Sequence, residues 1–404
     1  MNLLIVATCD FYTKPNPSFH LLKSLIADAL NSGISIRLIG MEEVGLNKHI
    51  PDEFKDHPNF KYSLVKTKPV KKSKLVMRYL SGIKYAIATR KYLKQYVPTS
   101  DVIYVRSSPT VLFNIIAVKF FCKKQKIIYG VQDMFPGSTI AAGKMPNKVM
   151  QNVFYRLQKI AYKKSDIITV ISNDMKTKLL EQGVPEEKIR VIVNWFDDQA
   201  VREIPREKNI FIQKYNMQRD IFYVQYAGTM GYVFDYMMVI NVAEILKSNS
   251  DILFQMIGEG SQKEDFIKEA NKRELNNIVF LPLEPQEMVP HVYSACDICF
   301  IPLKKGIIGN SVPSKAGLLM ACRRAIVTTA DEGSDYNAMI NNEQIGIACP
   351  TDNPQIVADA ILLMRNDTKF RNDCANRGYE YGKDLYSRTL NTRKFISLFE
   401  SLAE

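Results

Sequence analysis

Short apolar runs alternate with longer amphipathic segments along the first half of the chain. Residues 18–30 have the spacing of an amphipathic helix, and further helical stretches separate the later apolar runs. Apolar runs of about four to eight residues favour buried strands, and their alternation with helices is typical of a parallel sheet covered on both faces. The pattern therefore predicts a doubly wound α/β domain. Its predicted strands are residues 3–7, 34–39, 102–105, 126–130, 167–171 and 189–193.

A second series begins after a polar stretch at residues 194–218, which we expect to be irregular. Helical patterns at 236–246 and 262–273, and others starting near 285 and 313, separate its apolar runs. In a doubly wound sheet, ligands bind beyond the carboxyl ends of the strands. The sequence thus predicts two such domains facing a central cleft, where a ligand would bind. The predicted strands of this series are residues 222–227, 252–257, 278–281, 297–301 and 325–328.

The domain limits follow from these patterns. The first domain would span residues 1–196 and the second residues 197–386. A last helical segment at 387–404 would pack on the second domain or cross back to the first. No apolar run approaches the roughly 18 residues that a membrane-spanning helix needs, and the first residues lack the basic region of a secretory signal. We therefore expect a cytoplasmic protein.

Charge is concentrated in one part of the sequence. The formal net charge is +12, and residues 61–94 contain eleven Lys and Arg but no Asp or Glu. Apolar and aromatic residues are interspersed among them, which fits peripheral attachment to an anionic membrane surface. Nucleic-acid binding or an ordinary solvated helix face would also fit this composition.

The seven cysteines do not suggest a metal site. Cys296 and Cys299 form a C-x-x-C pair, but no second pair or nearby histidine supplies further ligands. Because the pair lies in a predicted buried strand, we expect core cysteines in a reducing compartment.

Glycine-rich loops follow three predicted strands of the second domain. They are YAGTMG at 226–231, GEGS at 258–261 and GNSVPSK at 309–315. Glycine lets a backbone approach a ligand closely, and the first N–H groups of a helix attract phosphate. Tight strand-to-helix connections would need glycine as well. The repetition at successive strands favours binding of a nucleotide diphosphate.

These motifs, in this order, resemble those of the retaining glycosyltransferases of family 4, which have the GT-B fold. ACDICFIPL at 295–303 matches the same family, as do QDMFPGS at 132–138 and SDIITVIS at 165–172 in the first domain. The likeness is greatest to the branch that builds capsule, O-antigen and exopolysaccharide units, in which Val-Pro-Ser-Lys is typical. It covers nearly the whole chain.

The resemblance implies transfer of a sugar, with retention, from a nucleotide sugar of the UDP type to a lipid-linked glycan. No metal, cofactor or nucleic acid would take part. The second domain would bind the donor and the first the acceptor, with Asp133 as the acceptor-side carboxylate and Gln132 as a hydrogen-bonding partner of the acceptor sugar. Lys315 would stabilise the departing diphosphate. The implied donor-binding residues are Gly228, Thr229, Gly258, Gly260, Pro282, Leu283, Lys304, Asn310, Ser311, Val312, Pro313, Ser314 and Lys315.

Several positions differ from the family pattern. Leu318 stands where relatives carry a glutamate that binds the ribose, and residues 232–235 lack the usual basic side chains. These differences motivate a second hypothesis, a non-catalytic GT-B partner subunit of a polysaccharide assembly system. Glu332 follows another strand and could cap the next helix or contact the ribose, and we favour the cap.

Overall fold

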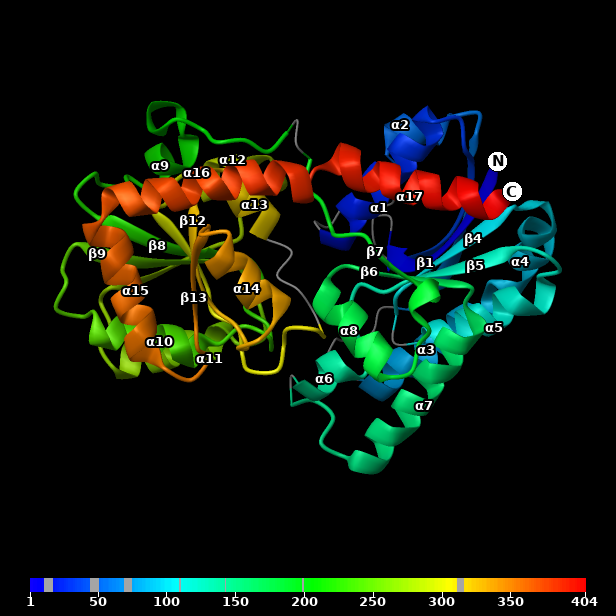
Figure 1. The fold of residues 1–404 in the computed structure, drawn as a ribbon, viewed down its shortest axis with the longest axis horizontal. Helices are drawn as coiled ribbons and strands as arrows, with labels where there is room; N and C mark the ends of the chain where they lie inside the picture. The colour runs from blue at the N-terminus through cyan, green and yellow to red at the C-terminus, as the bar shows by residue number, and fades with distance from the viewer. Residues whose placement is uncertain are drawn as a thin grey trace. The chain divides into compact units, whose positions relative to one another are not determined.

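The computed structural model describes residues 1–10, 17–43, 51–68, 75–108, 110–141, 143–197, 200–310 and 316–404. Its contacts divide the chain into two compact units. Unit 1 comprises Met1–Asn194 with Thr389–Glu404, and unit 2 comprises Trp195–Arg388. Each unit contains one parallel sheet with helices on both faces (Figure 1). The prediction of two doubly wound α/β domains is confirmed.

The sheet of unit 1 has seven strands in the order β3-β2-β1-β4-β5-β6-β7. Every neighbouring pair is parallel, as in β1 and β4, where Leu3 pairs with Val102 and Val6 with Val105. The strand β3 is an addition to the predicted set. The strands are β1 (Asn2–Asp10), β2 (Ser35–Glu43), β3 (Phe60–Thr67), β4 (Val102–Arg106), β5 (Lys126–Gly130), β6 (Ile167–Val170) and β7 (Ile189–Val191).

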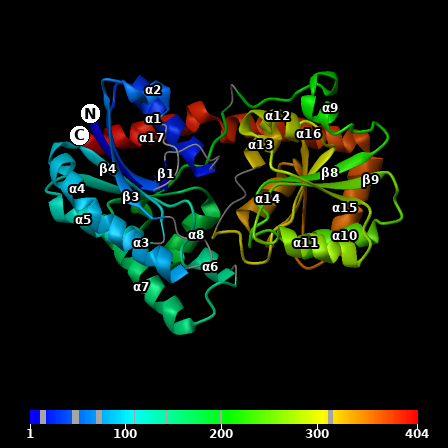
Figure 2. The same cartoon turned by 180° about the vertical axis from the view of Figure 1, so that it is seen from behind.

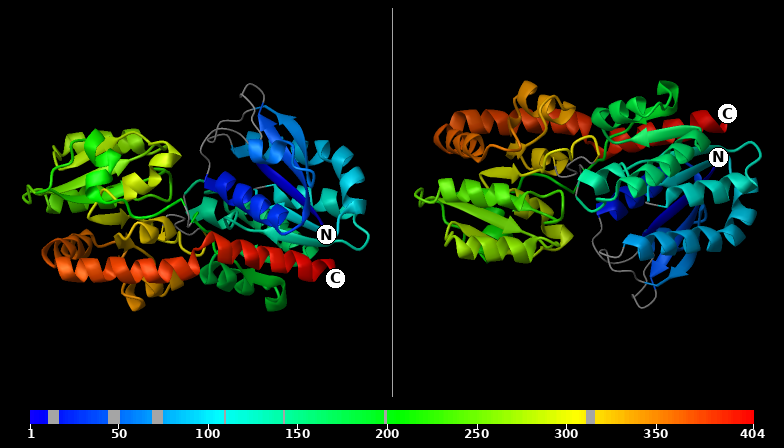
Figure 3. Two further views of the ribbon diagram at one scale, coloured as in Figure 1. Left: turned by 90° about the horizontal axis from the view of Figure 1, so that it is seen from above. Right: turned by 90° about the horizontal axis from the view of Figure 1, so that it is seen from below.

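Helices α1 and α17 cover one face of this sheet, and α3, α4, α5 and α7 cover the other (Figures 1 and 2). The rings of Phe395 and Phe399 on α17 lie 5.6 and 5.8 Å from the ring of Tyr104 on β4. The two chain ends therefore lie near each other on unit 1 (Figure 3). The helices are α1 (Pro17–Asn31), α2 (Asp52–Lys55), α3 (Leu75–Ala88), α4 (Arg90–Tyr96), α5 (Val111–Phe121), α6 (Gly137–Ala141), α7 (Lys148–Lys164), α8 (Asn173–Glu181) and α17 (Arg388–Ala403).

The sheet of unit 2 has six strands in the order β10-β9-β8-β11-β12-β13. The strand order reverses at β8 and β11, which is the position where doubly wound sheets bind ligands. The strands are β8 (Phe222–Ala227), β9 (Ile252–Ile257), β10 (Ile278–Leu281), β11 (Ile298–Ile301), β12 (Ala325–Thr329) and β13 (Gly346–Cys349).

Two apolar cores lie on opposite faces of this sheet because successive strand residues point to opposite sides. Val224 and Tyr226 of β8 join the core under α10 and α15, whereas Tyr223 and Ala227 join the core under α12 and α13. All six residues of β8 are buried, as expected for a central parallel strand. The helices are α9 (Ile210–Lys214), α10 (Tyr236–Ile245), α11 (Lys263–Lys272), α12 (Val289–Tyr293), α13 (Ala316–Ala321), α14 (Asp335–Asn342), α15 (Pro354–Asn366) and α16 (Thr368–Leu385).

The segment that opens unit 2 is more ordered than its polar composition predicts. It contains α9, whose Phe211 is fully buried in the core under α12. Asn209 caps α9 by accepting hydrogen bonds from the backbone N–H groups of Phe211 and Ile212, and its amide donates to the carbonyl of His291 at 2.9 Å. The expectation of an irregular segment is therefore wrong for residues 209–214.

Candidate functional site

The carboxyl edge of the unit 2 sheet carries consecutive loops that contain the predicted donor-binding residues. The strands β10, β9, β8 and β11 are neighbours in that order, so the loops that follow them are neighbours as well. The structure thus brings the described members of the predicted set to one edge of one sheet. In the same order along the edge they are Pro282 and Leu283, Gly258 and Gly260, Gly228 and Thr229, and Lys304 and Asn310.

The loops after β8 and β9 are joined by backbone hydrogen bonds. The N–H of Gly228 donates to the carbonyl of Ile257 at 2.8 Å, and the N–H of Met230 donates to the carbonyl of Glu259 at 2.9 Å. In return, the N–H of Gln262 donates to the carbonyl of Met230 at 3.1 Å. These three bonds join backbone groups only, so this part of the contact between the two turns does not depend on side-chain rotamers.

The glycines of these loops are required by the loops themselves. Gly258 has a φ of 137°, and a Cβ there would lie 2.0 Å from the carbonyl oxygen of Gly228. A Cβ on Gly260 would lie 2.2 Å from the carbonyl oxygen of Met230. No side chain fits such distances, so contact between the loops is a sufficient cause for both glycines. The family resemblance assigns them to close approach of the nucleotide, and that role stays a prediction.

A buried glutamine connects three of the loops. Gln262 is 8% exposed, and its amide donates to the carbonyl of Phe234 at 2.9 Å and also to that of Gly231. Its side-chain oxygen accepts a hydrogen bond of 3.1 Å from Nζ of Lys304. Gln262 therefore positions Lys304, one of the predicted donor-binding residues. In the sequence, Gln262 is a polar residue directly after Gly-Glu-Gly-Ser, and we did not predict a role for it.

The loop after β11 is held by residues that follow β12. The N–H of Gly306 donates to both carboxylate oxygens of Asp331, at 2.8 and 3.0 Å. The amide of Asn310 donates to the carbonyl of Gly306 at 2.9 Å, which closes the turn. This arrangement leads the chain toward α13. The predicted residues Ser311, Val312, Pro313, Ser314 and Lys315 lie outside the described residues.

The loop after β10 combines exposed and buried residues. Pro282 and Leu283 are exposed, whereas the carboxylate of Glu284 is buried against Nζ of Lys214 at 2.7 Å and the hydroxyl of Tyr215 at 2.5 Å. Burial alone would raise the pKa of the Glu284 carboxyl, but the hydrogen bonds from Lys214 and Tyr215 outweigh it and lower that pKa. The ionised carboxylate therefore ties this loop to the end of α9.

The expected helix cap after β12 is a different residue. The hydroxyl of Ser334, not the carboxylate of Glu332, accepts the hydrogen bond from the backbone N–H of Asn337 at the start of α14. Serine with an extended backbone is a common N-cap residue. Ser334, two residues after Glu332, therefore has the residue type that this position favours. Glu332 is exposed.

The predicted acceptor residues lie at the carboxyl end of β5 in unit 1. The N–H of Val131 donates to the carbonyl of Thr169 at 2.8 Å, which holds the start of this loop beside β6. Gln132 is half-buried and Asp133 is exposed. Beneath them, burial raises the pKa of Tyr129 to about 12, and its hydroxyl accepts a hydrogen bond from the amide of Gln158. A neutral, fixed tyrosine thus supports the loop.

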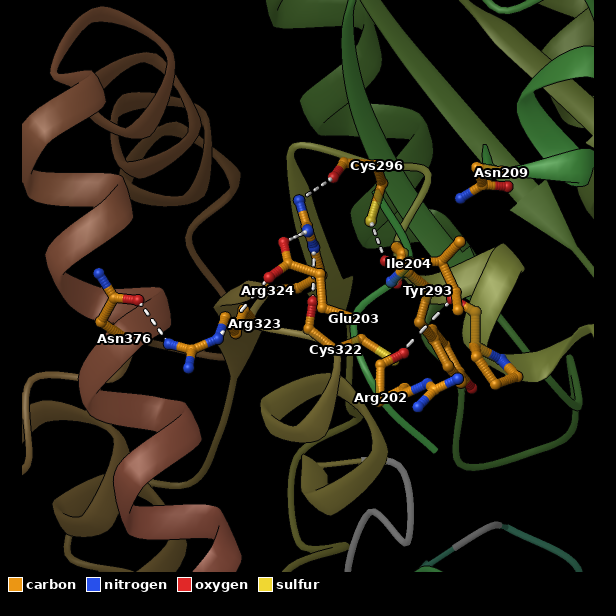
Figure 4. Close-up of polar contacts among 12 residues, drawn as sticks. Arg202, Glu203, Ile204, Asn209, Tyr293, Cys296, Cys322, Arg323, Arg324 and Asn376 are labelled. Carbon is orange, nitrogen blue, oxygen red and sulfur yellow. Dashed lines mark hydrogen bonds and ion pairs between the residues drawn. The ribbon is translucent and has the colours of Figure 1, made fainter. Parts of the chain in front are cut away.

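The opposite, amino edge of the unit 2 sheet carries a polar cluster around Arg324 (Figure 4). The guanidinium of Arg324 donates to the carboxylate of Glu203 and the carbonyl of Cys296, both at or below 3.1 Å. These contacts fasten residues 200–204 to the sheet. The cluster lies at the end of the strands away from the candidate site, so we assign it a structural role.

The cysteine thiols near this cluster are buried and have low reactivity. Sγ of Cys296 lies 3.5 Å from Sγ of Cys299, and both residues are buried, which confirms the expectation of core cysteines. Burial raises the pKa of Cys322 to about 12 and that of Cys299 well above its ordinary value. Within the described ranges, no three His, Cys, Asp or Glu residues are grouped so that they could hold a metal ion.

Two protein-family models match the chain, one in each half. The model described as glycosyl transferases group 1 matches residues 207–381, and the model described as glycosyltransferase family 4 matches residues 50–200. The first match contains the row of loops at the carboxyl edge of unit 2, and the second contains Gln132 and Asp133.

Named relatives and a solved structure are similar over most of the chain. The probable glycosyltransferase WbjE of Pseudomonas aeruginosa is 25% identical over 72% of this chain and 72% of its own length. WcaI of Escherichia coli, whose name links it to colanic acid biosynthesis, is 23% identical over 57% of this chain and 56% of its own. The crystal structure of HepE of Anabaena with UDP-glucose has a TM-score of 0.74 and 15% identity, and the match covers 99% of this chain and 100% of that one.

Proposed function

Since the chain is a glycosyltransferase with the GT-B fold, we propose that it transfers a sugar from a UDP-type nucleotide sugar to a lipid-linked oligosaccharide or polysaccharide precursor, with retention. The observation that carries this proposal is the row of loops after β10, β9, β8 and β11, at the switch point of the unit 2 sheet. The UDP-glucose in HepE supports the donor class, and the name of WcaI supports polysaccharide synthesis.

The donor would bind along this row of loops. The preordered backbone after β8 and β9 suits a diphosphate, because N–H groups at loop and helix starts bind phosphate oxygens. Leu283 and Pro282 are exposed where the nucleobase would lie. Lys304 and Lys315 would supply positive charge to the phosphates. Preordered charge of this kind stabilises a leaving diphosphate without reorganisation in the transition state.

The transfer itself would proceed as follows. An acceptor hydroxyl oxygen forms a bond to the anomeric carbon on the same face from which UDP leaves, so that configuration is retained. The bond from that carbon to the β-phosphate oxygen breaks, and UDP departs with the electron pair. Asp133 is the residue proposed to take the hydroxyl proton, because it is an exposed carboxylate at a strand end of the acceptor-binding unit. Gln132 would hydrogen-bond the acceptor sugar. Lys315 would take the role that a divalent cation has in metal-dependent enzymes, so the proposed reaction uses no metal or other cofactor.

A lipid-linked acceptor requires the enzyme to work at a membrane. No described helix is long and apolar enough to cross a bilayer. The eleven basic residues of the 61–94 segment would instead hold unit 1 against the anionic inner face of the cell membrane from the cytoplasmic side.

A non-catalytic partner subunit is the second candidate. Leu318, on α13, offers no hydrogen bond to a ribose, and residues 232–235 supply no basic side chain to phosphates. A subunit of this kind would retain the fold and the membrane contact without turnover.

A donor screen separates the two candidates. The protein is incubated with a panel of UDP-, GDP- and dTDP-sugars and a lipid extract containing glycan precursors, and nucleotide diphosphate release is measured. Release with one UDP-sugar, dependent on the lipid, is the expected result. No release with any sugar, together with no heat on calorimetric titration with millimolar UDP, would favour the partner subunit.

A further inference from the structure

One stretch of unit 1 is far more basic than the protein as a whole. Residues 58–165 contain 22 Lys and Arg but only 2 acidic residues, Asp101 and Asp133. The rest of the chain is therefore net negative, because the whole chain carries only +12. This stretch extends well beyond the 61–94 segment and includes α3, α4, α5 and α7. None of these four helices contains an Asp or Glu.

The same helices expose unusual amounts of apolar side chain. Of the sixteen large apolar residues that are exposed in the described part of the chain, eight lie on α3, α5 and α7. Val149 is 72% exposed and Phe120 is 71% exposed. We call these eight residues, with the basic residues of the same helices and α4, the α3–α7 face. The eight are Met77, Leu80, Ile87, Ile116, Phe120, Val149, Val153 and Ile160.

The helices that carry the α3–α7 face are packed against one another. The ring of Tyr79 on α3 lies 5.8 Å from the ring of Phe113 on α5 and 5.0 Å from that of Phe154 on α7. On α4, the guanidinium of Arg90 lies 5.1 Å from the ring centre of Phe120. The helices lie together on one side of the sheet (Figure 2). The exposed apolar residues thus belong to helices that form one packed layer on this side of the sheet.

Helix α7 shows how charge and apolar surface are combined. At about 100° per residue, Val149, Val153 and Ile160 fall within about 40° of arc on its exposed side. Arg156, Lys163 and Lys164 flank this stripe, and Lys148 and Lys159 lie further round. In the described part of the chain, no ion pair joins these five basic residues to a carboxylate. They are available for anions outside the protein.

We infer that the α3–α7 face binds the surface of an anionic lipid bilayer, with α7 lying in the interface. The basic residues would contact lipid phosphates, and the apolar stripe would enter the boundary between headgroups and acyl chains. The inference rests on the proposed function in one respect, namely that a lipid-linked acceptor places the enzyme at a membrane. It assigns the contact to α7 as well as to the 61–94 segment.

Other occupants fit the face less well. Seven of its eight exposed apolar residues are aliphatic, whereas nucleic-acid surfaces stack bases on aromatic rings. A second copy of the chain would bring two sets of excess positive charge together, which is repulsive. An anionic bilayer complements both the charge and the aliphatic side chains.

Vesicle sedimentation tests the inference with the full-length protein. Vesicles of phosphatidylcholine alone are compared with vesicles containing about one third phosphatidylglycerol. The protein should bind only the anionic vesicles, and binding should weaken as salt rises from about 0.05 to about 0.5 M. The R156Q/K159Q/K163Q variant should bind about 100-fold more weakly, because each basic residue near an anionic surface contributes about a factor of five. The V149S/V153S/I160S variant should lose at least about tenfold.

Matched control variants in unit 2 should bind like the wild type. They are K208Q/K268Q/K369Q for charge and I356S/L363S for exposed apolar residues. Thermal melting of each variant confirms that it is folded. Wild-type binding by the α7 variants would overturn the inference, as would tighter binding to RNA or DNA than to vesicles, or self-association that the α7 variants abolish.

The donor screen keeps the two proposals apart. The α7 variants should release nucleotide diphosphate from the donor at the wild-type rate when a detergent-dispersed acceptor replaces vesicles. Loss of vesicle binding with that rate retained supports the inference. If no donor is used by any form while anionic vesicles still bind, the proposed function fails and the surface assignment stands.

Discussion

The two units share a doubly wound parallel sheet but differ in surface charge. Unit 1 has 33 Lys and Arg against 16 Asp and Glu, whereas unit 2 has 21 against 26. In unit 2, basic residues pair with acids, as Arg273 at the end of α11 does with Glu244 on α10 at 2.7 Å and with Glu269 on its own helix at 2.9 Å. Helices α3, α4, α5 and α7 of unit 1 have no acid for such pairs. Two units with the same sheet architecture therefore differ widely in surface charge, and the basic surface of unit 1 is the one for which we propose an anionic partner.

The carboxyl edges of the two sheets differ in a related way. In unit 2, backbone hydrogen bonds lock the loops after β8 and β9 together. In unit 1, the loop after β5 presents the side chains of Gln132 and Asp133. UDP-, GDP- and dTDP-sugars share a diphosphate, which a fixed backbone can bind, while acceptor glycans vary and require side-chain contacts. The variants below test this division of roles.

The row of loops after β10, β9, β8 and β11, where we propose that the donor binds, is called the donor edge below. The largest expected effect concerns Lys315, the predicted cation of this edge. Lys315→Ala should lower the turnover number by about 100- to 1000-fold, because the positive charge proposed to stabilise the leaving diphosphate would be removed. The melting temperature should stay within about 2 °C of the wild type. Lys369→Ala, at an exposed site on α16, is the control and should transfer sugar normally. Normal turnover of the Lys315 variant would remove this residue from the mechanism.

The second variant tests whether close backbone contact between the loops after β8 and β9 stabilises the donor edge. Gly258→Ala should lower the free energy of unfolding by about 3 kcal/mol or more, since the new Cβ would collide with the carbonyl oxygen of Gly228. Gly333→Ala is the matched control, because Gly333 also has a positive φ of 76° but nothing lies within 4 Å of its Cβ. It should cost only about 1–2 kcal/mol of backbone strain. Urea unfolding measures both, and equal losses would contradict the interlocked loops.

Much of the donor edge could be predicted from sequence because its strands are short apolar runs. The predicted limits of β8, β9 and β10 agree with the structure, since each run is fully apolar or nearly so and ends at Gly or Pro. The edge strand β3 was missed for the opposite reason. In FKYSLVKT only Phe60, Ser63 and Val65 are buried, and the lysines that protect an exposed sheet edge conceal the strand.

Contacts between distant residues could not be predicted. Glu284 and Lys214 are 70 positions apart, so neither sequence stretch shows that the two side chains meet. Gln262 joins loops that follow different strands, and its importance depends on their packing. Position 258 likewise requires glycine because the backbone of Gly228 in the neighbouring loop lies against it. The sequence motif had suggested only that a ligand approaches there. Periodicity predicts elements, but not which atoms of separate loops touch.

The third effect concerns the anchor of the loop after β10. Glu284→Gln should lower the free energy of unfolding at pH 7 by about 2 kcal/mol, because the charge-assisted hydrogen bonds from Lys214 and Tyr215 are weakened. The pKa of Glu284 is lowered in the folded protein, so its contribution is present above the ordinary carboxyl pKa and is lost as pH falls through the lowered value. The difference between variant and wild type should therefore shrink below about pH 4. Glu343→Gln, at an exposed position, should change little at any pH.

The smallest expected effect tests whether a side chain of the donor edge contacts the bound nucleobase. Leu283 is 51% exposed beside the proposed base position, so a bound nucleobase would cover apolar surface that now faces solvent. Leu283→Ala should then raise KM for the donor about fivefold, because about 1 kcal/mol of apolar burial is lost, while kcat stays the same. The equally exposed Leu363→Ala on α15 should leave both constants unchanged. If KM is unaffected by Leu283→Ala, the donor edge recognises its ligand through backbone alone, and the contrast with the side-chain-lined edge of unit 1 becomes sharper.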